Sequence, residues 1–188
     1  MIFSTHAMSE NGPAGLPPGI RPWTIGDIPE VRRIGWETWN AAYGKFIPVE
    51  DLRAYQDEHY SVEALTRNIE RPSARGYMAL LGGNPAGYMI MSFDEKSGRC
   101  SVASIYVLPG SQGHGLGSML MNEAFRIARE AEYDRVWLGV MVDNAPAIAW
   151  YHSLGFTFVE KSPFTMGRTT VWHLIGFKIL TSPAHEPT

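Results

Sequence analysis

The segment Gln112-Gly113-His114-Gly115-Leu116-Gly117 lies between an apolar run at 101–108 and an amphipathic stretch at 116–131. The apolar run is typical of a strand, and the stretch after the segment repeats apolar residues at helical spacing. Glycines between a strand and a helix let main-chain N–H groups gather at the helix N-terminus, where the helix dipole also favours an anion. The segment therefore predicts an anion-binding turn, most naturally for a phosphate. A flexible loop with glycine caps is the plainer alternative.

Two common phosphate-binding motifs do not match this segment. A Walker loop ends in Gly-Lys followed by serine or threonine, and residues 112–118 contain no lysine. A dinucleotide fingerprint has the spacing GxGxxG, whereas these glycines are each separated by a single residue. That fingerprint also belongs to an early βαβ unit, whereas this turn follows residue 110. A nucleotide-dependent oxidoreductase is therefore disfavoured.

Helical patterns occur on both sides of the turn. The helix after it should bury one stripe, made of Leu116, Leu120, Ala124, Ile127 and Ala131. An earlier helix should begin at Asp27, with Pro29 in its first turn and Glu30 completing a capping box. Further helices are expected at 49–55, after a cap at Ser61, and within 143–156, where Gly155 ends the helix.

Strand-like segments alternate with these helices. They lie at 20–24, 76–81, 86–93, 101–108, 135–142, 157–161 and 170–179. The GGNP sequence between the second and third segments indicates a β-hairpin. Because hairpins occur among the alternating helices and strands, the sequence predicts one α/β domain with a mixed sheet.

Length and composition fit a single domain of ordinary size. The chain has 188 residues and a mass of 20.9 kDa, with 45% apolar residues and a net charge of −3. We expect residues 1–18 to be a disordered leader, 19–181 to be the folded domain and 182–188 to be a flexible tail. The near-neutral charge balance argues against a nucleic-acid-binding protein held by phosphate contacts.

Other composition features exclude several kinds of site. The longest apolar stretch, Val136–Val142, is far shorter than the roughly 18 residues that a membrane span requires. The N-terminus has no secretory pattern, so a cytoplasmic location is expected. The single Cys100 excludes an intramolecular disulfide and is interpreted as a core residue. The six histidines lack metal-ligand spacing, so no metal site is expected.

Two motifs in fixed order resemble those of the Gcn5-related N-acetyltransferases, the GNAT superfamily. Gln112-x-x-Gly115-x-Gly117 is similar to the acyl-CoA pyrophosphate loop of that superfamily. About 30 residues later, Asn144-x-x-Ala147-x-x-x-Tyr151-x-x-x-Gly155-Phe156 is similar to its second signature. The resemblance implies a central sheet that opens between the strands around 101–108 and 135–142, with acetyl-CoA as co-substrate and no metal.

The resemblance also implies a role for individual residues. The main chain of the turn would hold the pyrophosphate, at Gln112, Gly113, His114, Gly115, Leu116, Gly117 and Ser118. Tyr106 and Val107 would run beside the pantetheine, and the Val107 amide would polarise the thioester carbonyl. Asn144 would bind the pantetheine arm, or cap the following helix, or do both. Tyr151 would protonate the departing CoA thiolate as general acid.

The general base stays open at this point. Many members of the superfamily carry a glutamate on the strand before the turn, but residues 101–106 include no carboxylate. An alkyl amine, whose pKa is near 10.4, must still lose a proton before it attacks. The candidates are Tyr106, Glu37 and a water chain that ends at surface carboxylates.

The acceptor cleft of the superfamily is built by the first helices and the last strands. In this chain those regions supply Trp36, Glu37, Trp39, Tyr43, Phe46 and Phe164. Aromatic faces suit an apolar or cationic acceptor, although such side chains are also ordinary core residues. Acidic residues in the early helices would favour a polycation, or they form a solvated helix face. They are Glu37, Glu50, Asp51, Asp57, Glu58 and Glu63.

A finer resemblance concerns the PaiA-type branch, some members of which acetylate polyamines. It rests on WLGV, on NAPAIAWYHSLGF and on Phe164-Thr165-Met166-Gly167, after which Arg168-Thr-Thr-Val replaces the expected acidic residues. The sequence thus predicts acetyl transfer to a primary amine of a small molecule, either polyamine-like or arylalkyl. A protein N-terminal acetyltransferase and a non-catalytic acyl-CoA-binding regulator are the alternatives. Family analogy also suggests a homodimer formed through the late strands.

Overall fold

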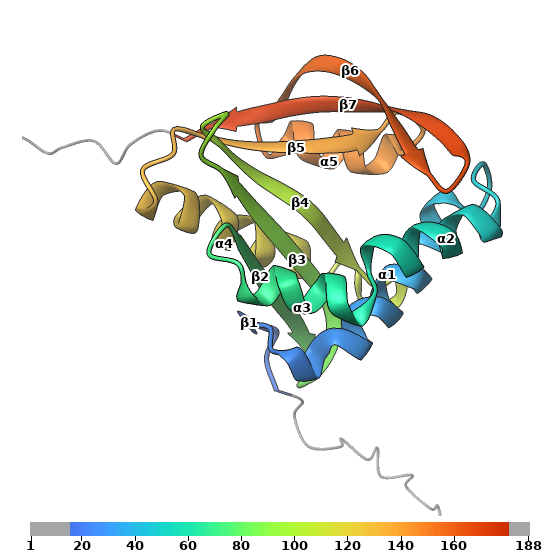
Figure 1. Ribbon diagram of the computed structural model, residues 1–188. Coiled ribbons are helices and arrows are strands. Elements are labelled where there is room, and N and C mark those ends of the chain that lie inside the picture. The colour runs from blue at the N-terminus through green and yellow to red at the C-terminus, as the bar shows by residue number, and fades with distance from the viewer. Residues whose placement is uncertain (1–15, 181–188) are drawn as a thin grey trace, which may run out of the picture.

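The computed structural model describes residues 16–180, which form a seven-stranded sheet with helices on both faces (Figure 1). The strand order is β1-β2-β3-β4-β5-β7-β6, and only β4 and β5 are parallel neighbours. The strands are β1 (Gly19–Pro22), β2 (Ala74–Leu81), β3 (Asn84–Asp94), β4 (Arg99–Val107), β5 (Arg135–Met141), β6 (Thr157–Met166) and β7 (Thr169–Ile179). The predicted α/β fold with a mixed, mostly antiparallel sheet is confirmed. Most of the expected leader and all of the expected tail lie outside the described residues.

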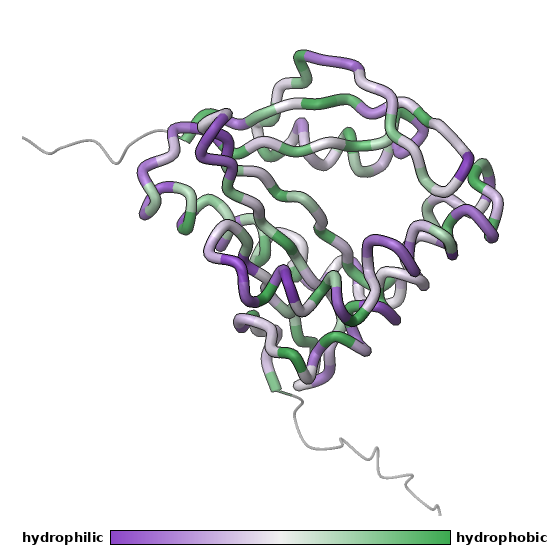
Figure 2. Tube along the Cα trace, in the orientation of Figure 1, coloured by the Kyte–Doolittle hydropathy of each residue, from purple (hydrophilic) through white to green (hydrophobic). Residues whose placement is uncertain are grey.

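Five α-helices cover the sheet, and they pack into two hydrophobic cores. The helices are α1 (Ile28–Tyr43), α2 (Val49–His59), α3 (Val62–Glu70), α4 (Leu116–Glu130) and α5 (Ala145–Ser153). One core contains the buried residues of α4 and α5, and the other contains those of α1, α2 and α3. Figure 2 shows hydrophobic segments along the central strands and hydrophilic ones along outer helix turns and loops. Within residues 16–180, none of the helices combines the length and apolar character needed to span a bilayer.

The sheet opens between β4 and β5. These strands pair at only three positions, Cys100–Val136, Ser101–Trp137 and Val102–Leu138, and then diverge (Figure 1). The β3–β4 register shifts directly after these positions, because Ile90 pairs with Ser104 while Met91 pairs with Val102. Ala103 is therefore the extra residue of a β-bulge, which bends β4 away from its neighbour. The predicted opening is confirmed, and β7 restores the sheet by pairing along the whole of β5.

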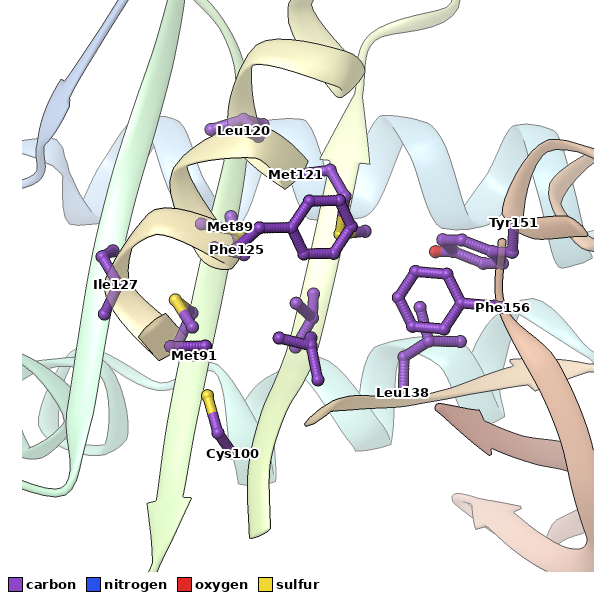
Figure 3. Close-up of a cluster of buried hydrophobic side chains, with 14 of the residues drawn as sticks. Met89, Met91, Cys100, Leu120, Met121, Phe125, Ile127, Leu138, Tyr151 and Phe156 are labelled. Atoms are coloured by element: carbon purple, nitrogen blue, oxygen red, sulfur yellow. The ribbon is translucent and has the colours of Figure 1, made fainter. Parts of the chain in front are cut away.

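Helix α4 packs its apolar face on the sheet close to this opening. Figure 3 shows Leu120, Met121 and Phe125 directed from α4 toward β3, β4 and the α5 side. Most of the predicted stripe is buried, but Ala131 is exposed and lies one residue past the end of the helix. The buried face is wider than predicted because Met121, Phe125 and Ala128 also pack inward.

The start of α1 differs from the prediction. A short 3₁₀ turn at Ile25–Asp27 precedes the helix, and the capping box joins Thr24 to Asp27 rather than Asp27 to Glu30. The Asp27 carboxylate also accepts two hydrogen bonds of 2.7 Å from the Arg21 guanidinium. The capping box lies three residues earlier than predicted, because the Asp27 carboxylate accepts from the N–H of Thr24 at 2.7 Å. The cap predicted at Ser61 is confirmed, since its hydroxyl oxygen accepts from the N–H of Ala64.

Candidate active site

A cavity of about 390 Å³ lies in the opening between β4 and β5. The two strands form its walls, and β7 extends one wall with His173 and Ile175. Helices α1 and α2 contribute Tyr43 and Tyr55, while Asn144 and Tyr151 approach from the α5 side. The cavity therefore brings three residues of the second motif, Asn144, Ala147 and Tyr151, to the open edge of β4.

The glycine turn ends at an uncapped helix N-terminus. Gly113 and Gly115 have φ values of 79° and 78°, a left-handed conformation that favours glycine. No side chain caps α4, and the N–H of Met119 donates back to the carbonyl of Gly115 at 3.0 Å. The N–H groups of Leu116, Gly117 and Ser118 precede this first helical bond, so they are directed out of the helix toward the turn. This arrangement fits an anion such as a pyrophosphate.

Gly117 has a packing role in addition to its place in the turn. A Cβ atom at this position would lie 3.2 Å from the indole of Trp150 on α5. The indole therefore rests against the first turn of α4 because residue 117 has no side chain. Nearby, the Gln112 amide donates to the Val107 carbonyl at 3.2 Å, and His114 Nδ1 lies 3.0 Å from the Gln112 carbonyl. The turn is thus joined to the end of β4.

One edge of β4 faces the opening with free main-chain groups. The N–H of Leu108 donates to Ala86 at 2.9 Å, on the β3 side. Because successive residues of a strand direct their N–H groups to opposite sides, those of Val107 and Ile105 are directed into the opening. Val107 was predicted as a donor there. Ile105 was missed, and only the strand register identifies it.

Tyr151 is buried at the inner face of α5, with 7% of its surface exposed. Its ring packs edge-on against Phe156, and Figure 3 shows its hydroxyl directed toward the β4 side of the opening. Burial raises the pKa of this phenol above its usual value, and the nearby Tyr43 adds to the rise. The hydroxyl therefore keeps its proton at neutral pH. Asn144 caps α5, since its Oδ1 accepts from the N–H of Ala147 at 3.4 Å.

Tyrosines gather on the opposite face of the opening, where α1 and α2 cover β4. The Tyr60 hydroxyl lies 2.5 Å from Ser104 Oγ, and the Tyr106 ring packs against Trp39 and Tyr88. Burial raises the pKa of Tyr106 well above its ordinary value, and neighbouring tyrosines raise it further. A phenol with a raised pKa stays protonated at neutral pH and so offers no basic form, which disfavours Tyr106 as the base.

The structure separates the predicted acceptor residues. Tyr43 and Phe164 line the main cavity, and Phe46 packs against Tyr43 with ring centroids 6.1 Å apart. Trp39 is fully buried in the core and does not line the cavity, so the structure gives no support for an acceptor contact there. The other two, Trp36 and Glu37, line a second depression between α1 and residues 108–111.

The location of Glu37 also disfavours it as the base. Its carboxylate accepts a hydrogen bond of 2.8 Å from Arg33 on the exposed face of α1. It lines the second depression and does not line the cavity that contains Tyr151. Among the described residues, the cavity lining contains no carboxylate at all; Arg99 and His173 are its ionisable groups besides the tyrosines.

His173 was missed as a site residue, because histidines were considered only as metal ligands or as a surface residue of the turn. It lies on β7, where the alternation of strand residues places it on one face with Val171 and Ile175. That alternation was visible in the sequence. Which face bounds the opening became visible only from the strand order.

The described geometry agrees with comparisons to known proteins. The model of the family described as "Acetyltransferase (GNAT) family" matches residues 30–156. This chain belongs to the GNAT family. Its sequence and fold are those of a GNAT acetyltransferase.

Individual GNAT relatives resemble this chain over different lengths. The streptothricin acetyltransferase of Streptomyces lavendulae is 37% identical over 90 residues, which cover 47% of this chain and 48% of that protein. The chain thus matches about half the length of that relative. An uncharacterized N-acetyltransferase of Mycobacterium tuberculosis is 25% identical over 142 residues, covering 75% of this chain and 90% of that one.

A solved structure supports the same fold. The PaiA N-acetyltransferase of Thermoplasma acidophilum, in complex with coenzyme A, superposes with a TM-score of 0.77 at 20% identity. The superposition covers 87% of this chain and 99% of that one. The fold predicted from the GNAT resemblance is therefore confirmed.

Proposed function

We propose that this GNAT enzyme transfers acetyl from acetyl-CoA directly to the primary amine of a small molecule with an apolar or aromatic body. The observation that carries this proposal is the cavity between β4 and β5. Its lining joins Tyr151 to the free edge of β4 and to an aromatic wall that includes Tyr43, Tyr55 and Phe164. Among the described residues, no carboxylate accompanies these rings.

The residues around the glycine turn fit the co-substrate. Main-chain N–H groups between Gln112 and Ser118 would bind the pyrophosphate at the N-terminus of α4. The pantetheine arm would lie along the open edge of β4, beside Tyr106, with Asn144 as a further hydrogen-bond partner from the α5 side. Acetyl-CoA supplies the activated acetyl group as a thioester.

The chain's own groups then match the charges that form during transfer. The amine nitrogen attacks the thioester carbonyl, a C–N bond forms, and negative charge develops on the carbonyl oxygen. The N–H groups of Val107 and Ile105 are directed into the opening, where such donors stabilise an oxyanion. As the C–S bond breaks, the Tyr151 hydroxyl donates its proton to the CoA thiolate. Because burial raises the pKa of Tyr151, the phenol is protonated at neutral pH and its proton is present when the thiolate forms.

The cavity favours an arylalkyl amine over a polyamine. The Arg99 guanidinium lies 4.0 Å from the centre of the Trp137 ring and places a positive charge at one end of the cavity. A polycation would be repelled there and would find no carboxylate in the described lining. Aromatic side chains instead favour an acceptor that carries one amine on an apolar body.

The test is CoA-thiol release from acetyl-CoA with a panel of amines. The panel contains phenethylamine, tyramine, spermidine, spermine, a streptothricin and a short peptide with a free N-terminus. We expect kcat/KM for an arylalkyl amine to exceed that for spermidine by about tenfold or more. Preference for the peptide would instead indicate a protein N-terminal acetyltransferase. Tight binding of acetyl-CoA without turnover on any amine would contradict the proposed reaction and favour a binding regulator.

A further inference from the structure

His173 lies on the acceptor side of the cavity, at a position where β5 gives it room. Its imidazole stacks on the Phe164 ring, with ring centroids 4.2 Å apart and ring planes 9° from parallel. On β5, a Cβ atom at Gly139 would lie 3.2 Å from His173 Nδ1. Because residue 139 has no side chain, the imidazole extends over β5 toward the opening that Tyr151 also lines.

The surroundings of His173 keep its ring neutral and its nitrogens available. Burial lowers the pKa of this imidazole to about 4. Within residues 16–180, neither ring nitrogen has a hydrogen-bond partner. The other titratable groups that line the cavity come from α1, α2, β4, α5 and the residue after α2, namely Tyr43, Tyr55, Arg99, Tyr106, Tyr151 and Tyr60. His173 is thus the only side chain of the described lining with a basic nitrogen that is unprotonated at neutral pH.

We propose that His173 accepts the proton that the acceptor amine releases when its nitrogen bonds to the acetyl carbonyl. This inference rests on the proposed function. In the balanced step the neutral amine forms the C–N bond, its nitrogen becomes positively charged, and one N–H proton passes to an imidazole nitrogen. The C–S bond then breaks, and the thiolate takes the proton of Tyr151. Both protein groups afterwards return to their starting states by exchange with water.

The strength of the base fits this point in the reaction rather than an earlier one. An imidazole with a pKa near 4 is far too weak to deprotonate a free alkylammonium, whose pKa is near 10. The amine must therefore enter as its neutral form. Bonding to the carbonyl makes the nitrogen much more acidic, and at that stage a neutral imidazole within reach is able to take its proton.

The test compares His173→Gln with His152→Gln, a change at an exposed histidine on α5 outside the cavity. General-base groups typically contribute about 10²- to 10⁴-fold to the rate. We expect kcat of His173→Gln to fall by about 100-fold with the best amine, while KM for that amine and the affinity for acetyl-CoA change by less than about threefold. His152→Gln should keep the wild-type kcat. A kcat of His173→Gln within about threefold of wild type would overturn the inference.

Two further variants separate proton transfer from a structural effect. His173→Ala leaves a space that free imidazole is able to enter. Added imidazole should therefore raise the kcat of this variant at least tenfold. A Cβ at Gly139 would lie 3.0 Å from Ile175 and 3.2 Å from His173, so Gly139→Ala should displace the ring and lower kcat without weakening acetyl-CoA binding. Absence of imidazole rescue in a folded His173→Ala protein would contradict the inference.

The same measurements distinguish this inference from the proposed function. If wild type acetylates an amine and His173→Gln does so equally well, the proposed function stands and His173 is not the base. If wild type binds acetyl-CoA but acetylates no amine, the proposed function fails, and the role of His173 fails with it.

Discussion

The carboxylate of Asp51 accepts a hydrogen bond of 2.6 Å from the hydroxyl of Thr169, joining the first turn of α2 to the start of β7. The N–H of Arg168 donates to the same carboxylate at 3.0 Å. Gly167 has a φ of 59° and packs against Asp51, since a Cβ there would lie 2.6 Å from the Asp51 Cα. Asp51, which the sequence analysis included among acidic residues that would favour a polycation, therefore connects α2 to the β6–β7 hairpin that carries Phe164 and His173.

Replacing Asp51 with alanine should loosen this connection. We expect Asp51→Ala to lower the thermal unfolding midpoint and to raise KM for the acceptor, because the β6–β7 hairpin forms one wall of the cavity. The hydrogen bonds of Thr169 and Arg168 lower the pKa of Asp51, so its stabilising effect should be present above about pH 4 and lost as pH falls below the usual carboxyl value. Glu50→Ala, at an exposed neighbour, is the control. Equal unfolding midpoints for the two variants would contradict this prediction.

The Arg21–Asp27 pair predicts a second pH dependence of stability. Hydrogen bonding to Arg21 and Thr24 lowers the pKa of Asp27 from 3.8 to about 2, against the opposing effect of burial. The folded state therefore gains stability above about pH 4 and loses that gain as pH falls from 4 to 2. The shift corresponds to about 2 kcal/mol at most, and the partial exposure of Arg21 reduces the expected value to about 1 kcal/mol.

Urea unfolding of wild type and Asp27→Asn at pH 7 and pH 3 measures this contribution. The variant should be less stable at pH 7, and the difference should shrink at pH 3. Asp143→Asn, at an exposed position before α5, should have the same free energy of unfolding as wild type at both pH values. A difference between Asp27→Asn and wild type that is the same at both pH values would argue against the pair as its cause.

Gly115 is a residue of the turn where an added side chain should act through the backbone alone. Its φ is 78°, and a Cβ at this position would meet no atom within 4 Å. Gly115→Ala should therefore cost about 1 kcal/mol through left-handed strain, and it should weaken acetyl-CoA binding by displacing the N–H groups of α4. Gly110→Ala is the matched control, because Gly110 is equally open and has no positive φ. Isothermal titration with acetyl-CoA compares the two; equal affinities would contradict the prediction.

Tyr151→Phe should separate binding from catalysis. We expect kcat to fall by about 100-fold while the dissociation constant for acetyl-CoA changes little, since only the proton donor is lost. Because burial raises the pKa of Tyr151 above its usual value, wild-type activity should not decline through tyrosine ionisation up to about pH 10. Tyr133→Phe, at a partly buried tyrosine that packs against Phe93, should leave kcat unchanged. A kcat for Tyr151→Phe close to that of wild type would mean that another group protonates the CoA thiolate.

Local patterns predicted the parts of the site that are contiguous in sequence. The glycine turn, the start of α4 and the cap at Asn144 each depend on residues within one turn of a helix, so their spacing was sufficient. The aromatic set was harder, because Trp39 and Tyr43 lie one turn apart on the same helix and only packing buries the first more deeply. Asp51 and His173 could not be assigned from the pattern. Their partners are 118 residues away in the first case and on the neighbouring strands in the second.

The three-residue junction between β4 and β5 also bears on how the molecule resists unfolding. The strand pair β7–β6 is connected to the rest of the sheet through β5, and β5 joins β4 at only Cys100, Ser101 and Val102. A co-substrate seated along the opening would bridge the two parts and so bind only when both are folded and correctly placed. Its binding free energy then adds directly to conformational stability, by about 2.7 kcal/mol at a hundredfold excess over the dissociation constant. In a cell rich in acetyl-CoA, the abundance of this protein would therefore follow the supply of its own co-substrate.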